Sequence, residues 1–174
     1  IQEKLALPGI LMSQRALNYE SVNNYQIIEE LVQETVVETF ITKNDGEIFY
    51  AADDLMLEKP IDQFLAPEEH LQIINDDHGN QQIAFKTHLQ VINDGVRNQQ
   101  ITFETSEGNH FRSSLSQILF DDRVLGYLYI KIDACKIVQE KRNIILLFLL
   151  GSLLAIVLTT LIEAFYIHRL FVPR

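Results

Sequence analysis

Hydrophobic residues form their longest uninterrupted run near the C-terminus of the chain. Between Ile144 and Ile162 no residue is charged, and Leu, Ile, Val and Phe predominate. As an α-helix, which rises ~1.5 Å per residue, this run extends roughly 29 Å, close to the ~30 Å hydrocarbon thickness of a bilayer. A buried or amphipathic helix of this length would show a polar stripe, and the run has none. The pattern predicts a membrane-spanning helix over residues 144–165.

The position of this run separates it from two other kinds of apolar segment. A signal peptide would be N-terminal and would have a shorter apolar core. A tail anchor also ends in one span, but this chain opens on Ile1 rather than Met, and basic and apolar residues follow the run up to Pro173 and Arg174. We therefore expect a piece of a longer protein, with another span upstream and a linker beginning at residues 166–174.

Shorter periodic patterns fill the region before the span. Apolar residues between Ile10 and about Glu34 recur at spacings of three and four, which predicts a long N-terminal helix within residues 1–35. β-branched and aromatic runs over residues 36–42 and 47–52 flank an Asp-Gly turn, which predicts a β-hairpin. Residues 59–79 are typical of a loop with short helices.

The second half of the domain has the pattern of antiparallel strands. Residues 82–93 fit either a strand or a helix, and we favour a strand because a turn, Asp94-Gly95, follows them. Clearer strands are predicted over residues 100–105, 110–120 and 124–133. The order of elements predicts an α+β domain over residues 36–133 with one central antiparallel sheet. A juxtamembrane helix over residues 134–143 then leads into the span.

The net charge argues against one class of partner, and the number of cysteines excludes two kinds of site. The net charge is −10, and residues 1–143 hold 12 of the 14 basic and 23 of the 24 acidic residues. An acidic domain repels nucleic acid, so we expect no nucleic-acid binding. Cys135 is the only cysteine, which excludes an internal disulfide and a cysteine-based zinc site. The basic residues on the two sides of the span do not orient it.

Candidate catalytic and metal-binding patterns are weak. The acidic stretches Asp53-Asp54, Asp76-Asp77-His78 and Asp121-Asp122 could supply metal ligands, but such stretches at strand ends are more often solvated turns, which we favour. The histidines form no pattern with serine or cysteine that indicates a catalytic triad, and the seven glycines form no phosphate-binding loop. We expect no metal, no cofactor and no enzymatic activity in this segment.

Several stretches resemble one family of sensor domains. Phe40–Tyr50 looks like the opening hairpin of PAS-like extracytoplasmic sensor domains, the Cache family, and Phe111–Leu115 and Leu125–Ile130 are similar to their closing strands. Tyr166–Arg174 resembles the entry to a HAMP linker, where a Pro soon after the span is typical. The resemblance implies a bacterial receptor: a sensor histidine kinase of a two-component system, a diguanylate cyclase or a chemoreceptor. It also implies that the domain lies on the periplasmic side of the inner membrane.

The resemblance implies a ligand pocket over the sheet. Candidate ligand-binding residues on the closing strands are Phe111, Arg112, Ser114 and Tyr127. The guanidinium of Arg112 could clamp a carboxylate bidentately, although a surface ion pair with an acidic residue is the alternative. The chain has no Trp and so lacks the aromatic pattern of the amino-acid-binding members. The stimulus therefore stays open between a small molecule and a periplasmic partner.

The span itself carries a stripe of small residues. Gly151, Ala155, Thr159 and Glu163 follow one another at intervals of four and share one helix face. Such a face allows two helices to approach closely, so we expect a homodimer, with Glu163 near headgroup water or the partner helix. The sequence therefore favours a signalling receptor segment. The alternative is a membrane-anchored interaction module without signalling output.

Overall fold

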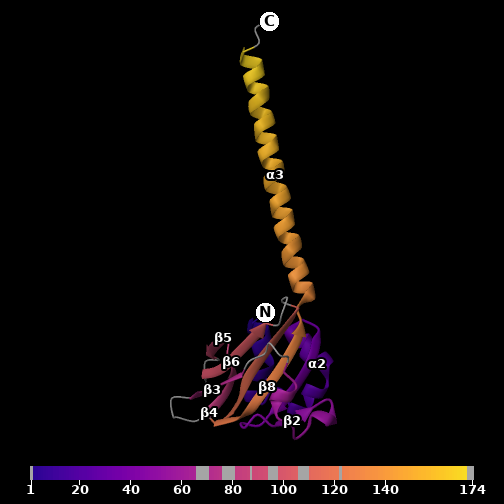
Figure 1. The fold of residues 1–174 in the computed structure, drawn as a ribbon, viewed down its shortest axis with the longest axis vertical. Helices are drawn as coiled ribbons and strands as arrows, with labels where there is room; N and C mark the ends of the chain where they lie inside the picture. The colour runs from indigo at the N-terminus through magenta and orange to yellow at the C-terminus, as the bar shows by residue number, and fades with distance from the viewer. Residues whose placement is uncertain are drawn as a thin grey trace. The chain divides into compact units, whose positions relative to one another are not determined.

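The structure, a computed structural model, describes residues 2–65, 71–75, 81–86, 88–93, 98–105, 110–121 and 123–171. These residues form an α+β fold with a mainly antiparallel sheet and an apolar C-terminal helix (Figure 1). This confirms the fold class at that level. The chain divides into two compact units, residues 1–135 and residues 136–174, and each is described by itself.

Six strands form the central sheet, in the order β2-β1-β8-β7-β6-β5, and each adjacent pair is antiparallel. Their bounds are β1 Val36–Thr42, β2 Ile48–Ala51, β5 His88–Asn93, β6 Asn98–Thr105, β7 Phe111–Phe120 and β8 Arg123–Asp133. The predicted hairpin and the three later strands are confirmed within a few residues. The last strand, β8, lies inside the sheet between β1 and β7.

A second, two-stranded sheet corrects the predicted loop over residues 59–79. It consists of β3 Leu71–Asn75 and β4 Gln81–Phe85. The short helix η3 Ile61–Gln63 agrees with the predicted short helical elements, whereas η2 Asp54–Met56 precedes the predicted range. The ambiguous segment 82–93 contains strands, as we favoured, but these are two, β4 and β5, and they belong to different sheets. The predicted turn at Asp94-Gly95 lies outside the described residues.

The N-terminal region differs from the one long helix that we expected. It forms α1 Gln2–Ser13, η1 Tyr19–Asn23 and α2 Tyr25–Val32. Arg15 has a φ of 60°, a left-handed conformation that continues no α-helix, so the chain turns directly after α1. Pro8-Gly9, a pair that is typical of a break before a helix, lies inside α1 instead, and both residues are buried. Gln33, with a φ of 59°, ends α2.

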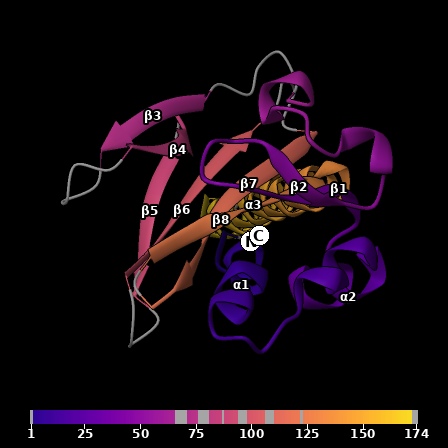
Figure 2. The same cartoon turned by 90° about the horizontal axis from the view of Figure 1, so that it is seen from below.

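The two faces of the central sheet have different coverings. In Figure 2, α1 and α2 lie on one face, and the β3–β4 hairpin lies on the other, together with η2 and η3. We call these the helix face and the hairpin face. On the helix face, the Ser13 hydroxyl accepts a hydrogen bond from the Leu119 N–H at 3.0 Å, which fastens the end of α1 to β7. On the hairpin face, the N–H of Phe85 donates to the Thr102 hydroxyl at 2.9 Å, which joins β4 to β6.

The described residues of the second unit all belong to one helix, α3, which runs from Cys135 to Phe171. The predicted juxtamembrane and membrane-spanning helices are therefore one element. Among the described residues, α3 contains the one segment, Gln139–Phe165, long and apolar enough to cross a membrane. Its described side chains are exposed throughout, which is compatible with a membrane anchor. The predicted linker over residues 166–174 starts as helix up to Phe171, and Pro173 lies outside the described residues.

Candidate functional site

The sheet separates the four candidate ligand residues onto opposite faces. Side chains alternate along a strand, and the register pairs Arg112 with Ile132 and Ser114 with Ile130 on the helix face. Phe111 and Tyr127 belong to the alternate positions, which face the β3–β4 hairpin. The four residues therefore cannot line one pocket together.

Tyr127 is part of the packed core rather than of an open pocket. Its side chain is fully buried, and its hydroxyl accepts a hydrogen bond from the Ile83 N–H of β4 at 3.2 Å. Beside it, the ring of Tyr129 stacks on Phe40 with 4.4 Å between centroids. The remaining members of this core cluster are Ile48, Ala51, Met56, Ile61, Phe85 and Leu115. These side chains fill the hairpin face of the sheet.

The other three candidates have unlike surroundings. Lys131 lies 5.5 Å from the ring centroid of Phe111, a cation–π contact. The Nε of Arg112 and the hydroxyl of Ser114 are buried and have no hydrogen-bond partner among the described residues. Arg112 also makes no ion pair with a described carboxylate. The surface ion pair that we considered for Arg112 is thus not seen within the described part of the chain.

Three β-bulges interrupt the regular pairing of the sheet. The register shifts leave one extra residue each in β1, β2 and β8: Val37, Phe49 and Leu125. All three are large apolar side chains that stay exposed, by 44% for Val37, 52% for Phe49 and 58% for Leu125. A bulge re-aims the side chain that it carries, which explains why apolar residues of a central sheet reach the surface here.

Gly126 allows the close approach of β1 and β8 next to one of these bulges. A Cβ atom built on Gly126 would lie 2.0 Å from the carbonyl oxygen of Thr42, far inside van der Waals contact. Any side chain at this position would push the two strands apart. The sheet around the Leu125 bulge therefore depends on a glycine.

Two neighbouring cavities lie beside the Leu125 bulge. The smaller, of about 310 Å³, is lined by Tyr19, Ile41, Thr42, Lys43, Phe49, Ile118, Leu125 and Gly126. The larger, of about 560 Å³, is lined by Met12, Arg15, Leu17, Asn18, Tyr19, Ile118, Phe120 and Leu125. They share Tyr19, Ile118 and Leu125, so they form one groove, which we call the bulge groove. Its lining residues come from α1, from the segment between α1 and η1, from η1, from the β1–β2 turn and from the strands β1, β2, β7 and β8.

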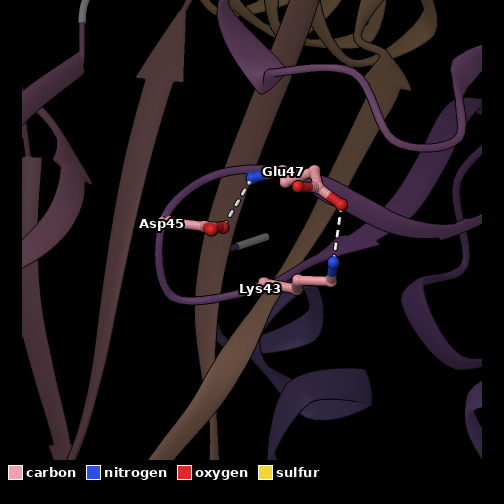
Figure 3. A network of polar contacts seen from close by, with 3 residues as sticks. All are labelled: Lys43, Asp45 and Glu47. Carbon is pink, nitrogen blue, oxygen red and sulfur yellow. Dashed lines mark hydrogen bonds and ion pairs between the residues drawn. The ribbon is translucent and has the colours of Figure 1, made fainter.

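The cations of the bulge groove differ in their partners. Lys43 forms an ion pair with Glu47 across the β1–β2 turn, and the N–H of Glu47 donates to Asp45 Oδ1 at 3.0 Å (Figure 3). The hydrogen bond that Lys43 donates to Glu47 raises the pKa of Lys43 and so favours its charged form. Arg15 instead lies 4.3 Å from the ring centroid of Phe120 and has no ion pair with a described carboxylate.

The acidic stretches behave as turns where they are described. Asp53 caps η2, since its Oδ1 accepts a hydrogen bond from the Leu55 N–H at 2.9 Å. Asp121 occupies the β7–β8 turn with a φ of 48°. Residues 76–78 and Asp122 lie outside the described residues. Among the residues described, no three His, Cys, Asp or Glu side chains gather as a metal site.

Cys135 and His110 meet where the sheet domain passes into α3. The Sγ of Cys135 lies 3.4 Å from Nδ1 of His110, and the Cys135 N–H donates to Asp133 Oδ1 at 2.8 Å. The interaction with the Asp133 carboxylate raises the pKa of the Cys135 thiol. A catalytic cysteine requires the opposite shift, toward the thiolate. This arrangement therefore suits a helix start better than a nucleophile.

On α3, the four residues of the predicted dimer face occupy one continuous helix. A Cβ atom built on Gly151 would meet no atom within 4 Å, so that position is open to a second helix. The hydroxyl of Thr159 donates to the carbonyl oxygen of Ala155 and is thereby satisfied within the helix. Dimerisation itself stays a prediction.

The bulge groove was not among the sites that the sequence predicted. Its two most exposed apolar side chains come from bulges, and a bulge follows from strand register rather than from an alternating pattern. Gly126 inside a predicted strand was the one usable signal, because such a glycine often marks a bulge or a close backbone approach. Comparison of the chain with protein-family models and with curated proteins finds no match.

Proposed function

We propose that this chain is the stimulus-sensing domain and the signal-transmitting membrane helix of a bacterial receptor. The support consists of an α+β domain with an antiparallel sheet, an apolar helix that follows it, and the resemblance of the hairpin and closing strands to PAS-like Cache domains. The domain would lie in the periplasm, and the chain would act as a homodimer with its signalling output in the cytoplasm.

The connection between β8 and α3 is the observation that carries this proposal. β8 ends at Asp133 and α3 starts at Cys135, so Ala134 alone separates an interior strand of the sheet from the helix. Ala134 is buried, and its N–H donates to the His110 carbonyl oxygen at 2.6 Å. Such a short connection contains no loop that would absorb a movement of β8.

The segment of α3 before the membrane would act as a lever. From Cys135 to Asn143 it contains no Gly or Pro, so no residue there favours a kink. A stimulus would shift β8 between two packings of similar energy, and α3 would carry the difference. An interaction module without output would need no such stiff connection.

The proposed orientation is tested by cysteine accessibility in intact cells. In a Cys135→Ser background, Asp45→Cys should react with a membrane-impermeant maleimide, and a cysteine appended after Arg174 should not. Permeabilised cells provide the control, since both cysteines should then react. Labelling of the appended cysteine alone in intact cells would refute the orientation.

The coupling is tested in a chimera that joins Arg174 to a histidine-kinase output domain. Tyr127→Phe removes the hydroxyl that accepts from Ile83, and this should change the basal kinase activity by loosening β8 from β4. Two glycines inserted after Lys136 should uncouple the helix, so that Tyr127→Phe has no further effect in that background. An equal effect of Tyr127→Phe with and without the insertion would argue against a lever, and no effect in either would favour the interaction module.

A further inference from the structure

We propose that the bulge groove binds an amphipathic monocarboxylate, with its apolar chain in the two cavities and its carboxylate at Arg15. The inference deepens the proposed function, on which it rests for its meaning, because it gives the sensing domain a site and a ligand class. It places the ligand on the opposite side of the sheet from the hairpin face, where the Tyr127 core cluster fills the space.

The shape of the groove suits an elongated molecule. The cavities of about 310 and 560 Å³ share three lining residues and therefore follow one another along the surface. Sites for small ligands are usually concave and mostly apolar, with a few polar groups that fix orientation. A ligand with a chain of six to ten carbons would extend across both cavities.

The lining of the groove is apolar although it is exposed to water. Tyr19, Phe49 and Leu125 are all about half exposed, and the Tyr19 ring lies 6.2 Å from that of Phe49. Each of these side chains would lose contact with water when an apolar chain covers it, which favours binding. The bulges hold Phe49 and Leu125 in this exposed position, so the surface is a fixed feature of the sheet.

The charges at the groove select an anion and point to one residue. Lys43, in the smaller cavity, is already paired with Glu47. Arg15, in the larger cavity, is held over the Phe120 ring and has no carboxylate partner within the described residues. A guanidinium held in this way presents its N–H groups to a planar carboxylate, with which it can form two hydrogen bonds.

Thr42 does not add a hydroxyl to the groove. It lines the smaller cavity, but the register pairs it with Tyr127, so its side chain belongs to the hairpin face. The groove therefore combines the cation of Arg15, which has no carboxylate partner among the described residues, with an apolar surface.

Isothermal titration of the full chain in lipid nanodiscs with sodium octanoate tests the inference. Empty nanodiscs give the heat of lipid partitioning, which is subtracted. We expect saturable binding, and hexanoate should bind more weakly by up to about fourfold for each missing methylene that the groove would bury.

Two variants with matched controls locate the site. Leu125→Asp puts a negative charge at the centre of the groove and should weaken octanoate binding at least tenfold, whereas Leu55→Asp, at another exposed leucine, should not. Arg15→Gln should weaken it about fivefold. Lys59→Gln should have no effect, although Lys59 also lies over an aromatic ring, that of Phe64.

A neutral ligand separates the contribution of the ligand's carboxylate from that of its apolar carbon chain. Octan-1-ol should bind more weakly than octanoate to the wild-type chain, and its affinity should not change in Arg15→Gln. Octanoate binding that is absent, or equal in the wild type and Leu125→Asp, would overturn the inference. So would self-association of the chain that Leu125→Asp abolishes, since a second copy would then occupy the groove.

These results are independent of the kinase chimera. Octanoate binding without any coupling through α3 would support the ligand site and contradict the proposed sensing function. Coupling through α3 without octanoate binding would keep the sensor and remove this ligand class.

Discussion

At the scale of single residues, Gly126 determines how closely β1 and β8 pack. Because an added Cβ would lie 2.0 Å from the Thr42 carbonyl oxygen, Gly126→Ala must displace one strand. Overpacking of this kind typically costs about 1–3 kcal/mol. We expect Gly126→Ala to lower the free energy of unfolding of the sheet domain by that amount, as measured by urea denaturation followed by circular dichroism.

Gly151→Ala is the matched control for this measurement. Its added methyl group meets no atom within 4 Å and lies on α3, where alanine favours the helix more than glycine does. The urea midpoint of the sheet domain should therefore stay unchanged. Equal midpoints for Gly126→Ala and the wild type would contradict the close approach of the two strands.

The thiol of Cys135 gives a pH-dependent prediction. The Asp133 carboxylate raises the pKa of this thiol, so its alkylation by iodoacetamide should rise with pH only above the range of an ordinary cysteine. Asp133→Asn keeps an oxygen that can accept from the Cys135 N–H but removes the charge, and should move the rate profile toward lower pH. Because the chain has one cysteine, the alkylation rate reports on this site alone.

Residue patterns in the sequence predict which side chains of one strand share a face. They do not predict which side chains of different strands come together in a site. Alternation along a strand puts Tyr127 and Tyr129 on one face, and the structure agrees because that part of β8 is regular. Arg112 and Ser114 came from the resemblance. Alternation separates them from Phe111 of the same strand, whereas their face relative to Tyr127 depends on the register of β7 and β8. The bulged Phe49 and Leu125 could not be predicted, since a bulge depends on how two strands pair.

At the scale of elements, strands with β-branched runs and turn residues were predictable, and the N-terminal helices were not. The spacing of apolar residues suggested one helix because it continues across the turn between α1 and α2. That turn arises at Arg15, whose left-handed backbone lets α1 and α2 pack on the same face of the sheet. Tertiary packing thus overrode the local periodicity. Strand β3 was missed because Ile73 and Ile74 are adjacent apolar residues, so its sequence does not alternate.

The stripe of small residues on α3 leads to a prediction about association in the membrane. Small residues at Gly151 and Ala155 allow two helix backbones to approach closely, and packing drives association in lipid. Gly151→Ile and Ala155→Ile should each lower the signal of a membrane two-hybrid assay on α3 at least twofold.

Leu153→Ile is the control for this assay, because position 153 lies roughly opposite Gly151 on the helix. It should retain the wild-type signal. If all three variants associate as strongly as the wild type, the stripe is not the dimer face.

At the scale of the whole molecule, one residue, Ala134, links the last strand of the sheet domain to α3. The acidic sheet domain holds the bulge groove, and its interior strand β8 leads through Ala134 into α3. The order of domain, last strand and apolar helix was readable from the sequence, because the run of apolar residues has an unmistakable length. The function that joins them is our proposal.

The most direct test of that proposal varies the rotation of α3 without any stimulus. In the kinase chimera, one to four alanines are inserted after Lys136, and each insertion turns the following helix by about 100° relative to the sheet. Alanine preserves the helix, so the stiffness of the connection is retained. A signal-transmitting helix predicts that basal kinase activity differs at least twofold for one to three alanines and returns close to the original for four, where the rotation is nearly a full turn. Equal kinase activity in all five chimeras, at equal amounts in the membrane, would contradict it.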